Sequence, residues 1–205
     1  MPLSAPAAAA PFQDGDQFAA IDIGSNSFHM VVARYTLGQL RVVDRLRETV
    51  RMAEGLDGFG GMSAEAQARA IDCLSRFGQR IADIPPVHVR AVATNTVRQL
   101  RAPAGFLVPA EAALGHAIEV VSGREEARLV YLGVAHAQPP KDDQLRLVID
   151  IGGGSTECII GRGAALHQAT TLPSSQARCP RMRSALTRSQ AAVRFSSSVR
   201  AFQFT

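Results

Sequence analysis

One stretch, residues 147–157 with the sequence LVIDIGGGSTE, constrains the fold of this chain more than any other. Its apolar half is short, rich in β-branched residues and ended by three glycines, which predicts a buried strand that enters a tight turn. Asp150 is the exception in that strand, because a buried carboxylate is costly unless it is paired, hydrogen-bonded or bound to a cation. We therefore expect Asp150 to lie at the strand end, where it could meet a cation.

The turn has the composition of a phosphate-binding loop. Glycines lack a Cβ, so backbone amides can turn towards an anion, and the next two residues add hydroxyl donors. Glu157 returns a second carboxylate to the same end of the turn, close enough to Asp150 to hold Mg²⁺ with it, directly or through water. The predicted phosphate-binding residues are Gly152, Gly153, Gly154, Ser155 and Thr156. A tight hairpin in which Asp150 caps the turn amides is the structural alternative.

Residues 18–27, FAAIDIGSNS, repeat this pattern near the start of the chain. An apolar run is again followed by Asp-Ile-Gly and then by small hydroxyl and amide residues. Two strand–Asp–Ile–Gly–turn units, at Asp22 and Asp150, predict two phosphate loops that face each other, one from each half of a duplicated fold.

The charge of the chain does not indicate a nucleic-acid partner. The 205 residues have a formal net charge of +4, but residues 172–205 hold six arginines and no acid. The preceding residues carry 16 basic and 18 acidic side chains, a net charge of −2. The basicity therefore belongs to the C-terminal segment, and we expect no nucleic-acid binding.

Cysteine usage and hydropathy favour a cytoplasmic protein. The three cysteines lack metal-ligand spacing and are odd in number, which favours reduced thiols. No apolar run approaches the roughly 18 residues that a membrane span needs. Residues 1–17 are rich in Ala and Pro without the basic start of a signal peptide, so we expect a disordered leader.

Periodicity predicts a first lobe over residues 18–140 and the start of a second over 145–171. The first lobe opens with a meander of antiparallel strands, after which Ser63 could cap an amphipathic helix. Later elements are expected as strands at 87–93, 118–121, 155–162 and 164–171, and as a helix at 102–116 interrupted near Pro109. Residues 172–205 show no clean periodicity, so we expect disorder or a sequence foreign to the fold.

The sequence TNTVR at 94–98 follows the strand expected at 87–93. Thr94 and Asn95 are good N-cap residues, and a helix start gathers amides that favour anions. Arg98, in the first turn, could bind a phosphate through two hydrogen bonds. The structural alternative is a capped helix with a solvated arginine.

A second helix start, at Ser122, presents two glutamates with different expected roles. Ser122 and Glu125 have the spacing of a capping box, in which the glutamate folds back onto the cap amide. Glu126 falls on the same helix side as Leu129 and Val130, so we expect it to point inwards. An inward glutamate near phosphate loops could act as a general base. A salt bridge to Arg90 or Arg128 is the alternative.

Five motifs in order match one known family: IDIGSNSFHMV at 21–31, RETVRMAEGL at 47–56, TNTVR at 94–98, SGREEARL at 122–129 and VIDIGGGSTE at 148–157. Over about residues 18–171 the chain resembles the exopolyphosphatase / guanosine pentaphosphate phosphohydrolase (Ppx/GppA) family, and within it the exopolyphosphatase branch most.

The resemblance implies an α/β fold of the actin-like, ribonuclease-H-like ATPase type, with the active site between two lobes. This chain would hold the first lobe and the opening strands of the second. Members of the family release the terminal phosphate of inorganic polyphosphate with Mg²⁺, and some cleave the 5′-γ-phosphate of pppGpp.

Carried over by position, the resemblance also assigns roles to residues. Glu126 would activate water, and Arg98 would bind the chain of phosphates. Asp22, Asp150 and Glu157 would serve Mg²⁺. The residues that would line the phosphate loops are Gly24, Ser25, Asn26, Gly152, Gly153, Ser155 and Thr156.

The resemblance leaves several functions open. Relatives continue through a whole second lobe and are commonly homodimers through later domains, whereas the match here stops soon after Thr171. The chain could be an exopolyphosphatase, a pppGpp 5′-phosphohydrolase, or a catalytically inactive truncated fragment that at most binds polyanions. An actin-like ATPase or sugar kinase would share both phosphate loops but would need an adenosine pocket from the second lobe.

Overall fold

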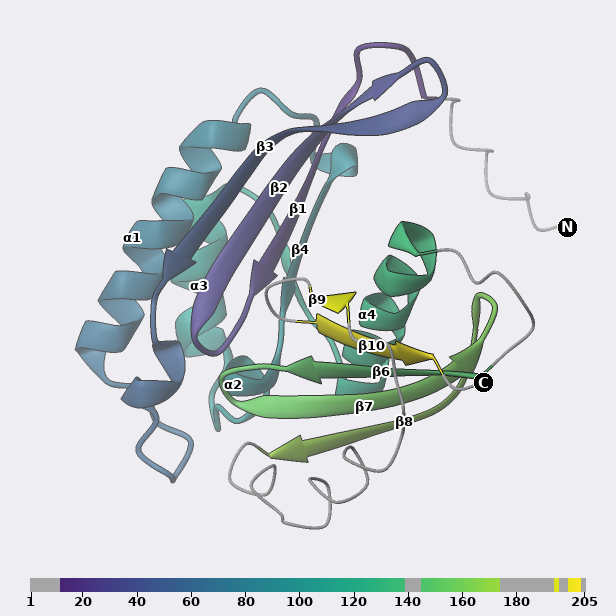
Figure 1. The fold of residues 1–205 in the computed structure, drawn as a ribbon. Coiled ribbons are helices and arrows are strands. Elements are labelled where there is room, and N and C mark those ends of the chain that lie inside the picture. Colours follow the sequence, from purple (N-terminus) through teal and green to yellow (C-terminus); the bar gives the residue numbers. More distant parts are fainter. Residues whose placement is uncertain (1–11, 139–144, 174–193, 196–198, 204–205) are drawn as a thin grey trace, which may run out of the picture.

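Two five-stranded sheets form the framework of the protein (Figure 1), described here from a computed structural model. The structure describes residues 12–138, 145–173, 194–195 and 199–203. The predicted lobe boundary at 141–144 lies outside these residues, as does most of the predicted leader.

The first sheet has the strand order β3-β2-β1-β4-β5. The expected antiparallel meander is present as β1 (Gln17–Ile23), β2 (Ser27–Thr36) and β3 (Gln39–Thr49). On the other side of β1, β4 (Val89–Ala93) and β5 (Ile118–Val120) are added in parallel. The end of β1 therefore lies at the centre of the sheet, which positions Asp22 between antiparallel and parallel neighbours.

Helices α1 (Ala64–Ile81) and α3 (Ala104–Leu114) cover one face of this sheet (Figure 1). The Ser63 hydroxyl accepts a hydrogen bond from the Ala66 amide at 3.3 Å, which confirms the predicted cap. The predicted apolar stripe of α1 is buried as Ala66, Ala70, Leu74, Phe77 and Ile81, and all of these except Ala66 belong to the main core. Shorter turns of helix are η1 (Met52–Gly55), η2 (Pro86–His88) and α2 (Asn95–Arg98).

Helix α3 continues through Pro109, so the predicted interruption is wrong. Proline has no amide hydrogen and cannot bond the carbonyl four residues earlier, which here belongs to Gly105. The side-chain amide of Gln67 on α1 donates to that carbonyl at 3.2 Å. A tertiary contact thus replaces the missing helical hydrogen bond.

The second sheet has the order β8-β7-β6-β10-β9, and its strands are antiparallel. Its elements are β6 (Leu145–Ile151), β7 (Ser155–Arg162), β8 (Ala165–Pro173), β9 (Arg194–Phe195) and β10 (Val199–Gln203). Helix α4 (Gly123–Ala137) packs on this sheet around a small core that includes Tyr131.

Two short strands, β9 and β10, lie in the range 172–205 that the sequence predicted to be disordered or foreign to the fold. β10 pairs with β6 through backbone hydrogen bonds, which any sequence except proline can supply. Among the described residues, no helix is both long enough and apolar enough to cross a membrane.

Candidate active site

The two Asp-Ile-Gly turns lie in direct contact. The first turn joins β1 to β2, and the second joins β6 to β7. A Cβ built on Gly153 would lie 2.5 Å from the Cβ of Asn26, and a Cβ on Gly154 would lie 2.7 Å from the Oγ of Ser25. The two loops therefore face each other at van der Waals distance.

A cleft of about 420 Å³ opens beside this contact. Most of the predicted site residues line it, namely Asp22, Gly24, Ser25, Asn26, Thr94, Glu126, Asp150, Gly152, Gly153, Gly154, Ser155 and Glu157. Three other predicted residues do not line the cleft themselves but contact or support residues that do. Thr156 is buried, the side-chain amide of Asn95 packs against Gly154, and Arg98 contacts the cleft through Glu126.

The glycines of the second loop have a steric role that the sequence reasoning did not foresee. None of the three has a positive φ, so the turn itself does not require a left-handed backbone. Gly153 and Gly154 instead leave the room that Asn26 and Ser25 of the first loop occupy. The amide of Gly152 donates to the Ser155 carbonyl at 2.9 Å and closes the turn.

Three carboxylates gather in the cleft with raised pKa values. Burial raises the pKa of Glu157 to about 7, and repulsion by Glu126 and Asp150 adds to the effect. Burial followed by repulsion from Glu126 raises the pKa of Asp150 to about 6. Solvent reaches Asp22 in the cleft, yet the protein around it raises its pKa to about 6, by desolvation first and then by repulsion from Glu126 and Asp150. The cleft thus concentrates negative charge.

The buried carboxylate of Glu157 is incompletely satisfied. Glu157 lies opposite Asp150 in the β6–β7 ladder and is only 1% exposed. Its Oε1 has no hydrogen-bond partner among the described residues. A buried acceptor without a donor is costly, which leaves this oxygen available to a cation.

Glu126 points inwards from α4, as the sequence predicted, and its side chain is only 15% exposed. Its Oε2 accepts a hydrogen bond from Nη1 of Arg98 at 2.8 Å, and the same nitrogen donates to the Val121 carbonyl at 2.8 Å. The expected alternatives, Arg90 and Arg128, pair with Glu119 and Glu125. Arg98 thus fixes the place of the Glu126 carboxylate.

At the start of α4, only one of the two hydrogen bonds of the predicted capping box is present. The Ser122 hydroxyl accepts from the Glu125 amide at 3.2 Å. The Glu125 carboxylate, however, binds Arg128 through two hydrogen bonds and does not fold back onto the cap amide. A charged partner one turn along the helix offers a stronger bond than the cap amide does.

Two basic residues of the cleft, His29 and Arg47, were missed by the sequence reasoning. His29 lies opposite Asp22 in the β1–β2 ladder and opposite Arg47 in the β2–β3 ladder, so the three form a row across adjacent strands. Desolvation and the charge of Arg47 lower the pKa of His29. The internal repeat could have revealed it, because His29 follows Asp22 at the same spacing as Glu157 follows Asp150. Ser27, Val130 and Ile151 complete the lining.

No three His, Cys, Asp or Glu side chains within the described ranges are arranged as a ready metal site. The cleft carboxylates surround a common space without converging on one point.

The sequence profile of the Ppx/GppA phosphatase family matches residues 31–190. The chain belongs to the Ppx/GppA phosphatase family. The matched range reaches beyond Thr171, where the motif comparison placed the end of the likeness.

Relatives of the Ppx/GppA chain include a guanosine-5′-triphosphate,3′-diphosphate pyrophosphatase of Vibrio vulnificus, 48% identical over 155 residues. That match covers 76% of this chain and 31% of the relative. A crystal structure of an exopolyphosphatase from Cytophaga hutchinsonii is 25% identical with a TM-score of 0.73, covering 89% of this chain and 56% of that one. The PPX-GPPA enzyme of Aquifex aeolicus is 28% identical with a TM-score of 0.67, covering 77% and 52%.

These comparisons confirm the predicted fold class, the first lobe of an actin-like α/β fold with the opening strands of the second. The chain spans about half the length of these solved relatives and about a third of the curated one.

Proposed function

We propose that this protein is an exopolyphosphatase, a Mg²⁺-dependent hydrolase that removes the terminal phosphate of inorganic polyphosphate. The observation that carries the proposal is the place of Glu126. Its carboxylate is held by Arg98 in a cleft that both Asp-Ile-Gly loops line. A base beside a site for phosphate is the arrangement that hydrolysis of a phosphoanhydride requires.

The charge of the cleft supports the need for a cation. Four acids line it, against one arginine and one histidine, so a polyanion would be repelled without added positive charge. Asp22, Asp150 and Glu157 would hold Mg²⁺, and the unsatisfied Oε1 of Glu157 fits that role. Mg²⁺ keeps several waters and uses one or two carboxylates, so it does not need three converging side chains. When bound, it would neutralise charge on the transferring phosphoryl group.

In this proposal the residues of the chain bind and orient the reactants. The loop amides and the hydroxyl of Ser25, with Thr94, would bind phosphate oxygens, and Thr156 and Asn95 would support the loops from behind. Water gives a proton to Glu126 as its oxygen forms a bond to the terminal phosphorus. The bond from that phosphorus to the bridging oxygen breaks, and the shortened polyphosphate leaves with the oxygen. Direct contact between Arg98 and phosphate stays a prediction.

A pppGpp 5′-phosphohydrolase is the second candidate. The Vibrio vulnificus relative, 48% identical over 155 residues, carries the name of that activity. The same bond type is cleaved in both substrates, so the same residues would act.

The experiment is a measurement of phosphate release from long-chain polyphosphate, pppGpp and ATP, each with Mg²⁺ and with EDTA. We expect Mg²⁺-dependent release, with polyphosphate the better substrate. Glu126→Gln should lower kcat by about 100-fold or more while polyphosphate still binds. Glu125→Gln, one residue away and bound to Arg128, is the matched control and should retain activity.

Unchanged turnover in Glu126→Gln would contradict the role of this residue. Release from pppGpp alone would select the second candidate, and release from ATP alone would indicate an actin-like ATPase. Binding of polyphosphate without any turnover would mean that the chain is an inactive polyanion-binding fragment.

A further inference from the structure

Segment 50–53 holds the first phosphate loop through backbone hydrogen bonds to the carbonyls of that loop. The amides of Val50 and Arg51 both donate to the Asn26 carbonyl, at 3.0 and 2.9 Å, and the Ala53 amide donates to the Ser25 carbonyl at 2.9 Å. Peptide bonds here are trans, so the N–H of each peptide points away from its C=O. With these carbonyls turned towards segment 50–53, the amides of Asn26 and Ser27 point away from that segment, and both residues line the cleft.

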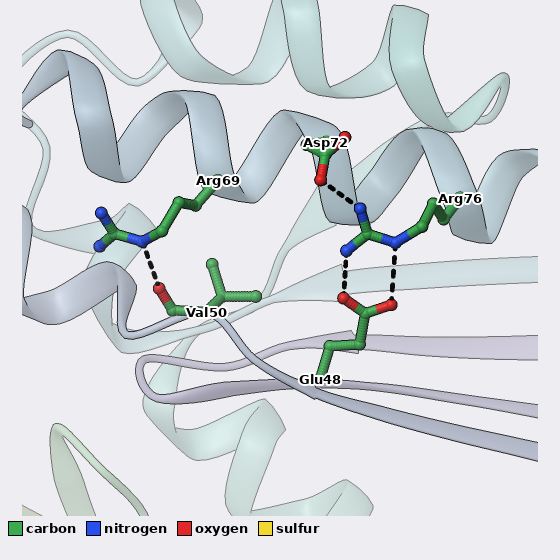
Figure 2. Close-up of polar contacts among 5 residues, drawn as sticks. All are labelled: Glu48, Val50, Arg69, Asp72 and Arg76. Atoms are coloured by element: carbon green, nitrogen blue, oxygen red, sulfur yellow. Dashed lines mark hydrogen bonds and ion pairs between the residues drawn. The ribbon is translucent and has the colours of Figure 1, made fainter.

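Arg69 of α1 lies at the other end of this arrangement (Figure 2). Its Nε donates to the Val50 carbonyl at 3.1 Å, and its Nη2 reaches the Arg51 carbonyl at 3.4 Å. The Val50 carbonyl and the Arg51 amide belong to one peptide unit, whose amide end binds Asn26. A continuous chain of hydrogen bonds therefore runs from the guanidinium through the 50–51 peptide to the 26–27 peptide of the loop.

The peptides in this chain point the same way. Each has its carbonyl on the side of Arg69 and its amide on the opposite side, so the positive charge of Arg69 reinforces the donor character of the last amide, that of Ser27. Arg51 also has a left-handed backbone, with φ 52° and ψ 48°, which is unusual outside glycine. Such a conformation persists only where its surroundings hold it, and the two bonds from Arg69 flank it.

We propose that Arg69 is a positioning residue for anion binding: it holds the 50–51 peptide and thereby keeps the Ser27 amide aimed at a phosphate group. Arg69 lies outside the cleft and touches no substrate. The proposal rests on the proposed function only for the identity of the anion.

Arg76, two turns further along α1, provides a matched control (Figure 2). Its guanidinium binds the carboxylates of Glu48 and Asp72, with Nε 3.1 Å from Oε1 of Glu48. Arg76 thus ties the same helix to the same edge of the sheet as Arg69 does, but through β3 and not through segment 50–53. A general loss of helix docking would affect both variants alike.

The test compares wild type, Arg69→Ala, Arg69→Lys and Arg76→Ala in the full chain. Hydrogen exchange without ligand should be faster over residues 24–28 in Arg69→Ala, and unchanged there in Arg76→Ala. Inorganic tripolyphosphate with Mg²⁺ should bind Arg69→Ala about 3- to 10-fold more weakly than wild type, a modest effect because Arg69 is exposed to solvent. Arg69→Lys, which can still donate to the Val50 carbonyl, should recover most of the affinity.

Unchanged exchange over residues 24–28 in Arg69→Ala would overturn the proposal, as would equal effects of Arg69→Ala and Arg76→Ala. If wild type binds no tripolyphosphate, the proposed function fails, whereas the positioning of the loop is still decided by the exchange comparison. Faster loop exchange with unchanged tripolyphosphate affinity would refute the link between Arg69 and anion binding.

Discussion

The unit of strands around Asp22 and the unit around Asp150 have the same kind of loop and the same strand order, but different helices cover them. Each consists of three antiparallel strands, β1-β2-β3 or β6-β7-β8, with Asp-Ile-Gly at the first turn. The first is covered by α1 and α3 over a large core, whereas the second packs on α4 around only four buried residues of the described chain. The same local pattern therefore gives the same strand–turn–strand arrangement twice, whereas the covering helices determine how large a core each unit has.

The loops also differ in a complementary way. Ser25 and Asn26 occupy the positions that Gly153 and Gly154 hold in the second loop. The side chains of the first loop fill the space that the glycines of the second leave open. A repeat with side chains in both loops could not bring them this close, so the difference in sequence is what allows the contact.

The largest expected difference between the units is in their cores. Phe77→Ala should lower the free energy of unfolding by about 3–5 kcal/mol, because it leaves a cavity in the main core. Ile159→Ala, in the small core, should mainly speed hydrogen exchange in β6, β7 and β8. Urea unfolding combined with hydrogen exchange checks both, and equal opening of the first sheet by Ile159→Ala would contradict the separation.

Glu157 and His29, which occupy equivalent positions in the two units, should make the free energy of unfolding depend on pH in opposite directions. The raised pKa of Glu157, about 7, gives a contribution that is present below its ordinary value of 4.5 and is lost as pH rises through 7. Without Mg²⁺, the free energy of unfolding of wild type should fall by on the order of 2–3 kcal/mol relative to that of Glu157→Gln as pH rises from 4 to 8.

The lowered pKa of His29 gives the reverse trend. Its contribution to stability is present above pH 6.5 and is lost as pH falls. Thermal unfolding of wild type, Glu157→Gln and His29→Gln across pH measures both. Parallel curves for the three proteins would show that neither group is perturbed as described.

The contact between the loops can be tested at Gly154. A Cβ there would lie 2.7 Å from Oγ of Ser25 in the first loop, so Gly154→Ala should cost about 1–3 kcal/mol and push the loops apart. Gly133→Ala is the control, since no heavy atom lies within 4 Å of its Cβ position and alanine favours a helix. Chemical denaturation should therefore give changes of opposite sign, and two stabilising substitutions would argue against close loops.

The smallest expected effects are at the helix caps. Ser63 caps α1 and Ser122 caps α4, each with one hydrogen bond to a backbone amide. Replacement of either by alanine should cost about 1 kcal/mol. Ser63→Ala should lower global stability, whereas Ser122→Ala should change exchange mainly in α4 and the second sheet. A global effect of both would mean that the two units unfold together.

Much of this comparison could be predicted from sequence, because it depends on local patterns. The spacing of apolar residues from Ala66 to Ile81 placed α1, and the two Asp-Ile-Gly stretches located both loops. The inward direction of Glu126 followed from the helical repeat.

The features that could not be predicted from sequence depend on contacts between residues far apart in the chain. The partner of Glu126 is Arg98, on another element, and not the nearby Arg128. His29 and Arg47 enter the cleft through strand pairing, which fixes which residues share a face. The passage of α3 through Pro109 depends on Gln67, 38 residues away from Gly105.

The two loops should bind one polyanion together, and hydrogen exchange with and without tripolyphosphate and Mg²⁺ tests this most directly. The ligand should slow exchange in residues 24–27 and in residues 152–155 over the same range of ligand concentration. Protection of one segment alone, or of neither at saturating ligand, would contradict it.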